Sequence, residues 1–303
     1  FHQRGRGLSE PQGSVANNTF DDVVQDAQLI RDFLGVRDRW AVFGGSNGAT
    51  LALLYASRFP ESVTGVVLRG YWAMTAPQVS WDYLGTGKRT IWPEEWELLC
   101  NLVNCTGTDL LRRFYSRLAG PAGDDGCAGL DAPPGCRLGC SWLRWDTLGS
   151  ALSLVPHDIC IRSYRDEDLN MEGQRLGPSI PSPPSLPLPE GPEWYQLHPL
   201  AAARLGVHFY LQQHVVPDLS GLLMSNVSVH FITGRFDMLC PPGFAAELVS
   251  EATAVGSRLW KQTIVEHAAH EGSDPGMTEA LDRALRELLV SVKYAEDGSR
   301  LFL

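Results

Sequence analysis

The sequence predicts an α/β fold, in which a mostly parallel sheet is flanked by helices and interrupted by a mainly helical insertion. At both ends of the chain, short and wholly apolar runs alternate with stretches of helical periodicity, as buried parallel strands and their crossover helices do. Between these ends the alternation stops in a segment rich in Trp, Gly, Cys and Pro. We therefore predict an α/β core of residues 1–70 and 223–303 and a helical cap of residues 71–222.

The first part of the core begins with a helix and continues as a strand–helix–strand unit. Apolar residues recur at helical spacing over residues 20–34, where Thr19 is placed to cap the helix and Gly35 to end it. The apolar runs at 40–43 and 63–68 have no polar face, which indicates strands buried on both sides. Because a helical pattern lies between them, the two strands should be parallel with a right-handed crossover.

The cap shows helical patterns but no clear strand. These patterns lie at residues 94–102 and 110–118. Seven prolines among residues 178–192 predict an exposed polyproline-like loop, because neither a helix nor an inner strand tolerates them. After residue 222 the alternation resumes, and it predicts strands at 227–233 and 259–265 and helices at 244–250 and 277–292.

Composition excludes two classes of partner. The 303 residues carry a formal charge of −10, and the pI is near 5.3. A chain this acidic, with no run of Lys or Arg, lacks the basic surface that nucleic acid requires. No apolar stretch reaches the ~18 residues of a membrane-spanning helix. We therefore expect no nucleic-acid partner and no membrane partner.

The cysteines bear on the compartment. The chain has 7 cysteines, with no CxxC pair and no His at zinc-finger spacing. An odd number without framework spacing favours reduced thiols and predicts a cytoplasmic location, while a disulfide within residues 127–140 stays open. Asn-x-Ser/Thr triplets begin at Asn17, Asn104 and Asn226. Such triplets are common by chance, and they carry no meaning in a cytosolic protein.

Residues 44–48, Gly-Gly-Ser-Asn-Gly, match the G-x-S-x-G nucleophile motif. Such a turn exposes Ser46 at its tip, and a Cβ atom on Gly44 or Gly48 is expected to clash with the sheet or the helix. The N-terminus of the following helix favours the negative charge that develops during reaction. The alternative is a glycine-rich turn that only connects strand and helix. The position between a buried strand and a helix favours the catalytic interpretation.

A serine nucleophile needs a base, and the base needs an orienting carboxylate. In this architecture both should follow later strands, the acid before the histidine. Asp237 follows the strand 227–233 and His270 follows the strand 259–265, although a capping aspartate and a surface histidine remain alternatives. His267 competes as the base, but the base should lie out on the loop, which favours His270. The two histidines lack a third ligand nearby, so we predict no metal site.

Several segments spread along the chain share their residues with one family. They are FHQRGRGLS at 1–9, VFGGS at 42–46, VLRG at 67–70, GRFD at 234–237 with CP at 240–241, and AH at 269–270 with DPG at 274–276. Together they resemble the proline iminopeptidases (prolyl aminopeptidases), serine peptidases of the α/β-hydrolase fold. The resemblance covers nearly the whole chain apart from the Pro-rich loop and residues 123–140. It implies Ser46 as nucleophile, Asp237 as orienting acid and His270 as base.

The same resemblance marks a difference at the start of the chain. Family members have an HGGPG loop before the segment that begins here, and its backbone N–H groups form half of the oxyanion hole. We therefore expect the sequence to be incomplete at its N-terminus, without that loop and without the first strands. The N–H of Asn47, where the family usually has Trp, remains as the evident oxyanion donor.

A second difference concerns the substrate. The family binds the substrate's cationic N-terminus with two glutamates of the cap. One lies in a W-x-x-W-E segment, which resembles Trp142 to Asp146 and puts Asp146 in the place of the glutamate. The other position is Gly206, which has no carboxylate. Trp142 and Trp145 are candidates to line a pocket for a pyrrolidine ring, or they are simply core residues of the cap.

These observations predict a serine exopeptidase that releases an N-terminal proline, or a similar small residue, from short peptides through an acyl-enzyme. Its partner is a small peptide with a free N-terminus, and it needs no metal or organic cofactor. Gly206 keeps open an esterase or a broader aminopeptidase. A non-catalytic binding protein of the same fold is a further alternative, if the oxyanion loop is truly absent.

Overall fold

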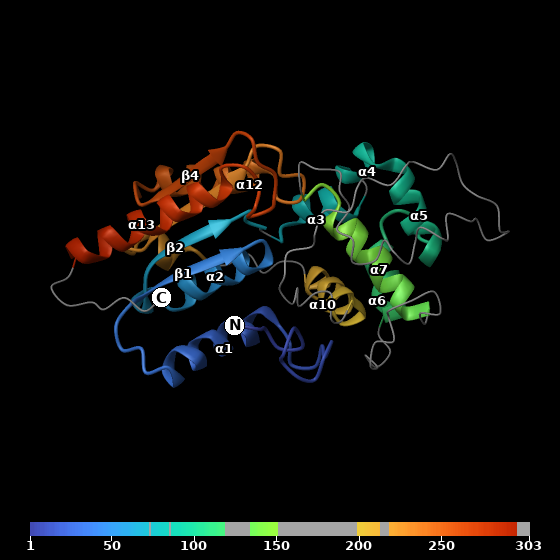
Figure 1. Ribbon diagram of the computed structural model, residues 1–303, viewed down its shortest axis with the longest axis horizontal. Helices are drawn as coiled ribbons and strands as arrows, with labels where there is room; N and C mark the ends of the chain where they lie inside the picture. Colours follow the sequence, from blue (N-terminus) through green and yellow to red (C-terminus); the bar gives the residue numbers. More distant parts are fainter. Residues whose placement is uncertain (73, 85, 119–133, 151–198, 213–217, 296–303) are drawn as a thin grey trace. The chain divides into compact units, whose positions relative to one another are not determined.

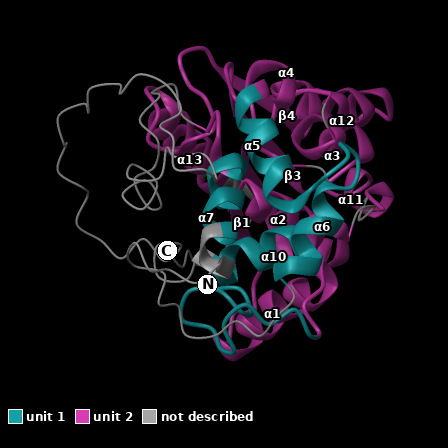
Figure 2. Cartoon of the chain, turned by 90° about the vertical axis from the view of Figure 1, so that its right-hand side faces the viewer, with its two compact units in different colours: residues 1–16, 94–146, 155–208 teal, residues 17–93, 147–154, 209–303 magenta. Residues whose placement is uncertain are grey.

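The computed structural model describes the chain except for residues 73, 85, 119–133, 151–198, 213–217 and 296–303. The predicted Pro-rich loop at 178–192 lies outside the described residues. The chain forms two compact units (Figure 2). Unit 1 comprises residues 1–16, 94–146 and 155–208, and unit 2 comprises residues 17–93, 147–154 and 209–303. The core and cap boundaries expected after residues 70 and 222 stay a prediction.

Unit 2 is built on a parallel sheet, which confirms the predicted fold class (Figure 1). Among the described residues the sheet has 4 strands in the order β1-β2-β3-β4. They are β1 (Trp40–Gly45), β2 (Val63–Arg69), β3 (Ser228–Gly234) and β4 (Trp260–Val265). All neighbouring pairs are parallel. Because parallel strands point the same way, the loops after all of them meet at one edge of the sheet.

Helices accompany each strand of unit 2. The larger ones are α1 (Phe20–Phe33), α2 (Asn47–Arg58), α12 (Pro242–Ala254) and α13 (Met277–Ala295). Shorter segments are η1 (Pro60–Ser62), α3 (Ala76–Tyr83), α4 (Lys88–Ile91) and α11 (Ser220–Leu223). Helix α2 packs on β1 and β2, whereas α13 packs on β2 and β3. Val67, Ile232 and Leu288 form one buried cluster between α13 and the sheet.

Helix α1 begins where its sequence predicts. Thr19 has extended backbone, and its hydroxyl accepts a hydrogen bond from the Asp22 N–H, while the Asp22 carboxylate accepts one from the Thr19 N–H. This reciprocal pair is a capping box, which satisfies two donors at the start of the helix. The helix ends before Gly35, whose positive φ of 67° permits the chain to turn.

Unit 1 contains helix α6 (Leu110–Leu118) and most of α5 (Pro93–Val103), α7 (Pro134–Thr147) and α10 (Pro199–Leu211). Pro93, Thr147 and the end of α10 from residue 209 belong to unit 2. The patterns at 94–102 and 110–118 predict α5 and α6 correctly. Trp96 packs on Trp145 with ring centroids 5.3 Å apart, and Phe114 packs on Trp142 at 5.1 Å. Trp142 and Trp145 are both fully buried, so these aromatic rings form the interior of unit 1.

The expectation of reduced thiols is wrong for part of the chain. Cys100 and Cys105 form a disulfide, and Cys140 is also disulfide-bonded, whereas Cys240 is a buried free thiol. Cysteine spacing did not reveal the Cys100–Cys105 disulfide, because the backbone conformation at the end of α5 brings these two residues together. The Cys105 N–H donates to the Cys100 carbonyl, and the Asn104 N–H donates to the Asn101 carbonyl. This is a Schellman motif, which folds the chain back on the last helical turn.

No helix in the described part of the chain has both the length and the apolar character needed to cross a membrane. The longest, α13, has 19 residues and carries Arg and Glu side chains along its exposed face.

Candidate active site

The turn between β1 and α2 has the conformation that the G-x-S-x-G motif requires. Ser46 lies between strand and helix with φ 55° and ψ −124°, in a region that residues other than glycine rarely adopt. Its N–H donates to the Arg69 carbonyl at the end of β2, over 2.8 Å. Backbone strain of this kind persists only where the surrounding structure imposes it, and it recurs at functional sites.

The two glycines of the motif differ. A Cβ atom on Gly44 would lie 2.1 Å from the Gly48 carbonyl oxygen, which no rotation of a side chain relieves. The expected clash is therefore confirmed at Gly44, where β1 and α2 approach most closely. At Gly48 an added Cβ would meet no atom within 4 Å, so the expectation of a clash there is wrong.

The carboxylate of Asp237 is held from two sides in the loop after β3. Its Oδ1 accepts hydrogen bonds from the Leu239 and Cys240 N–H groups, at 3.0 and 2.7 Å. Its Oδ2 lies 2.8 Å from Nδ1 of His270, and the Asp237 side chain is fully buried. Two backbone donors on one oxygen fix the carboxylate, so that the other oxygen faces the imidazole. The Asp237 carboxylate therefore presents a fixed acceptor to His270.

His270 is fixed by its backbone as well as by Asp237. Its N–H donates to the Ser150 carbonyl at 2.8 Å, and its own carbonyl accepts a hydrogen bond from the guanidinium of Arg69. The turn that carries it is closed by the Ala269 N–H, which donates to the Asp274 carboxylate at 2.7 Å. With Nδ1 facing the carboxylate, Nε2 is the nitrogen left to exchange protons with a substrate.

The structure distinguishes between the two candidate bases. His267 lies on the exposed surface, whereas the His270 side chain is 6% exposed and paired with Asp237. The geometry therefore favours His270, as the loop argument does.

The serine is not joined to this pair by a hydrogen bond. Among the described residues, no hydrogen bond of the Ser46 hydroxyl is found, so Asp237 and His270 form a dyad and Ser46 belongs to it only through the shared sheet edge. In enzymes without substrate the bond between nucleophile and base is often long and tightens on binding.

Arg69 connects the two halves of this site, and sequence reasoning did not assign it a role. Its carbonyl accepts from the Ser46 N–H, and its guanidinium donates to the His270 carbonyl. A Cβ on Gly45 would lie 2.6 Å from that guanidinium, so the arginine packs directly beneath the turn. The signal in the sequence was its place at the C-terminal end of a buried strand, where an arginine needs a partner.

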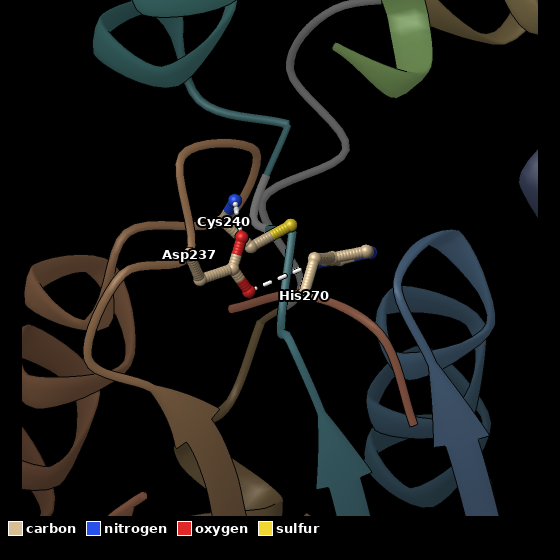
Figure 3. A group of neighbouring side chains, drawn as sticks. All are labelled: Asp237, Cys240 and His270. Atoms are coloured by element: carbon tan, nitrogen blue, oxygen red, sulfur yellow. Dashed lines mark hydrogen bonds and ion pairs between the residues drawn. The ribbon is translucent and has the colours of Figure 1, made fainter. Parts of the chain in front are cut away.

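Cys240 is a second residue to which the sequence did not assign a role. In Figure 3 its sulfur lies beside the carboxylate of Asp237 and the ring of His270. A carboxylate oxygen, the Cys240 thiol sulfur and an imidazole nitrogen lie within 4.8 Å of one another, and all three residues are buried. A carboxylate, a thiolate and an imidazole are all zinc ligands. Here, however, the facing atoms of Asp237 and His270 already form their own hydrogen bond.

The predicted substrate-binding residues lie in unit 1. Asp146 is half-buried near the end of α7, and Gly206 is buried within α10. Trp142 and Trp145 are packed against other aromatic rings. This environment favours the interpretation of the two tryptophans as core residues, and their role in binding stays a prediction. Asn47, the expected oxyanion donor, is the first residue of α2.

Comparison with known proteins agrees with the fold and with the sequence resemblance. A family profile described as "alpha/beta hydrolase fold" matches residues 1–96. A proline iminopeptidase of Arabidopsis thaliana is 27% identical over 93% of the chain, and one of Xylella fastidiosa is 28% identical over 93%. The chain spans 63% of the length of the first relative and 77% of the second.

Solved structures support the fold alone. A thermophilic esterase from Thermogutta terrifontis matches with a TM-score of 0.52 and 16% identity, covering 96% of this chain and 78% of that one. An epoxide hydrolase from Vigna radiata matches with a TM-score of 0.51 and 16% identity, covering 95% and 80%. The chain therefore has the α/β-hydrolase fold, and its sequence is similar to those of proline iminopeptidases.

Proposed function

We propose that the protein is a serine exopeptidase that releases an N-terminal proline, or a similar small residue, from short peptides. The observation that carries the proposal is the buried Asp237–His270 pair at the same sheet edge as the strained turn of Ser46. The names of the sequence relatives in Arabidopsis and Xylella support the choice of substrate.

In the proposed reaction, the Ser46 Oγ attacks the carbonyl carbon of the substrate's first residue while Nε2 of His270 takes the hydroxyl proton. Asp237 accepts the Nδ1 hydrogen bond and stabilises the imidazolium that forms. The tetrahedral intermediate collapses, the C–N bond breaks, and the amine leaves with the proton from His270. A water molecule then attacks the acyl-enzyme by the same sequence, which frees the amino acid and Ser46.

Negative charge on the carbonyl oxygen would be stabilised at the start of α2. The first N–H groups of a helix have no partner within the helix, and the N-terminus carries a partial positive charge. The Asn47 N–H directly follows the nucleophile, so it is the donor that we assign to the oxyanion. For the cationic end of the substrate we assign Asp146, whose carboxylate would form a charge-assisted hydrogen bond.

The test compares hydrolysis of a prolyl amide reporter by the full-length protein and by its Ser46→Ala variant. The variant should lose activity to background, and a fluorophosphonate probe should label the native protein at Ser46 only. Labelling with little prolyl activity would replace the exopeptidase by another serine hydrolase. Activity that survives in Ser46→Ala would overturn the mechanism. Absence of both labelling and hydrolysis in the native protein would favour the non-catalytic alternative.

Gly206 favours a second candidate, an esterase or a broader aminopeptidase, because this position offers no carboxylate to a cationic substrate. Comparison of a prolyl amide, an alanyl amide and a simple ester separates the candidates. An exopeptidase should lose activity toward both amides in the Asp146→Asn variant, whereas a neutral ester does not need that carboxylate. The cytoplasmic location of the enzyme stays a prediction, and the disulfides of Cys100, Cys105 and Cys140 weaken it.

A further inference from the structure

The end of α5 is shaped for a disulfide by its backbone alone. The Schellman hydrogen bonds from Cys105 and Asn104 bring the sixth residue back over the first, so the Cα atoms of Cys100 and Cys105 lie 4.8 Å apart. That separation falls within the range that a disulfide spans. The position that usually holds a hydrophobic contact in this motif therefore holds two thiols placed to be oxidised.

The asparagine inside this closed turn begins an Asn-x-Ser/Thr triplet. Asn104 precedes Cys105 and Thr106, its side chain is exposed, and its φ of 55° puts it at the tip of the turn. Two other asparagines begin such triplets, Asn17 before Asn18-Thr19 and Asn226 before Val227-Ser228. Both are exposed as well. In none of the three triplets is the middle residue a proline, which would block modification.

All three triplet asparagines lie outside helices and strands, within three residues of the end of one. Asn17 precedes α1, Asn104 follows α5 and Asn226 precedes β3. The remaining asparagines differ: Asn18 is buried, Asn47 and Asn101 lie in helices, and Asn170 falls outside the described residues. Chance would distribute triplets over both groups. Exposure at the loop tip is instead what a bulky glycan requires of the folded protein.

We infer that Asn104, Asn226 and Asn17 are N-glycosylation sites and that the chain folds in an oxidising, glycosylating compartment. The inference does not depend on the proposed catalytic function. In the modification, the Asn side-chain nitrogen attacks the anomeric carbon of an oligosaccharide carried on a lipid diphosphate. A C–N bond forms, the bond from the sugar to the diphosphate oxygen breaks, the lipid diphosphate leaves, and the amide loses one proton to a base of the transferase.

Oxidation of the Cys100 and Cys105 thiols is expected in the same compartment as glycosylation. The thiols of Cys100 and Cys105 exchange with a disulfide of an oxidant protein, so that one disulfide forms in the chain and the oxidant leaves as a dithiol. Disulfides of this kind persist in the endoplasmic reticulum and outside the cell, but rarely in the cytosol. The glycan and the disulfide thus indicate the same cellular compartment independently. Their residues Cys100 and Asn104 lie four positions apart in the sequence.

The test is expression of the full coding sequence in eukaryotic cells without any added targeting signal. The purified protein is treated with peptide-N-glycosidase, which converts each glycosylated Asn to Asp, and its peptides are examined by mass spectrometry. We expect conversion at Asn104, Asn226 and Asn17 and a matching shift in electrophoretic mobility. Because the sites are read from peptides, a variant that folds poorly is still informative.

Matched variants show which asparagine causes each shift in electrophoretic mobility. Thr106→Ala and Ser228→Ala should each remove one step of the mobility shift, whereas Thr106→Ser and Ser228→Thr preserve the triplets and should keep it. For the first site the variant is Asn17→Gln, because Thr19 caps α1 and its loss would also weaken the helix. Alkylation before and after reduction reports the thiols, with the free Cys240 as internal reference.

Protein without glycosidase-dependent Asp at any of the three sites overturns the glycosylation. Alkylation of Cys100 and Cys105 before reduction overturns the oxidised turn. Conversion of Asn to Asp at the three sites, together with Cys100 and Cys105 that resist alkylation before reduction, supports both the glycosylation and the disulfide. This result excludes the cytoplasmic location.

Discussion

The hydrogen bond between Asp237 and His270 is the most constrained contact of the candidate site. One carboxylate oxygen accepts from two backbone N–H groups, and the other faces the imidazole at 2.8 Å. An Asp237→Asn variant keeps an oxygen for the backbone donors but turns an N–H toward His270, which then presents the wrong tautomer. We expect kcat for the prolyl reporter to fall by roughly 10³–10⁴-fold with little loss of stability.

Steady-state kinetics and a urea denaturation curve check this prediction together. A kcat of the variant within a few-fold of that of the native protein would show that Asp237 has no role in catalysis. A large loss of stability would instead show that the pair serves mainly the fold.

Arg69 is expected to act through position rather than through contact with substrate. Its guanidinium donates to the His270 carbonyl, and its carbonyl receives the Ser46 N–H. In Arg69→Gln the loop of His270 loses a charge-assisted hydrogen bond, which is worth about 1.5–3 kcal/mol. We expect kcat to fall by about tenfold or more while KM changes little, and Arg69→Lys to restore part of the loss.

The matched control for this variant is Arg235→Gln. Arg235 forms an exposed ion pair with Glu266, and such pairs contribute little to stability. Equal effects of the two substitutions on kcat would show that Arg69 has no special role in positioning His270.

At the scale of elements, the packing of α2 on β1 depends on Gly44, which has no side chain. In Gly44→Ala the new Cβ would lie 2.1 Å from the Gly48 carbonyl, so strand and helix must separate. We expect a loss of several kcal/mol in the free energy of unfolding or failure to fold, as in other overpacked sites. Gly48→Ala is the control, because its Cβ meets nothing within 4 Å and alanine favours a helix. Similar urea midpoints for the two variants would contradict the packing argument.

Periodicity predicts the strands of unit 2 well, and all four described strands lie within two residues of the predicted ends. A continuous apolar run indicates a strand covered on both faces, and β2 and β3 are buried in this way. The same prediction is wrong for β1, where Phe43 is 52% exposed, and β4 is buried only at Trp260. Unit 1 is less regular: α7 and α10 escape prediction because Gly139 and Gly206 interrupt their helical patterns. The disulfide of Cys100 also escapes, because a Schellman turn rather than cysteine spacing creates it.

At the scale of the whole molecule, the sequence predicts correctly that Asp237 and His270 are neighbours, because the parallel topology of the sheet brings them together. Each follows a parallel strand, and parallel strands deliver their following loops to one edge. The place of Arg69 at the end of a buried strand indicates that it needs a partner, but the partner itself could not be predicted, since it is a carbonyl 201 residues later in the chain. Contacts of that range follow from the assembled fold, not from local pattern.

The stability of the assembled fold should depend on pH through a histidine that does not belong to the dyad. His230 lies buried on β3 with its Nε2 2.8 Å from the Thr263 hydroxyl. Burial, aided by the nearby Lys261 cation, lowers the pKa of His230 from 6.5 to about 4, and Glu287 opposes this only in part. Between pH 6.5 and 4 the unfolded chain therefore binds a proton at His230 that the folded chain does not bind.

Linkage then fixes the sign of the effect. Because the unfolded state holds more protons in this window, stability rises with pH, is fully present above pH 6.5, and is lost as the pH falls toward 4. We expect the urea midpoint to drop from pH 7.5 to pH 5.0 by less in His230→Asn than in the native protein. The exposed His267→Asn serves as control and should keep the native pH dependence. If His230→Asn and the native protein lose stability equally on acidification, another group carries the proton, and the buried imidazole of β3 is protonated as readily in the folded chain as in the unfolded one.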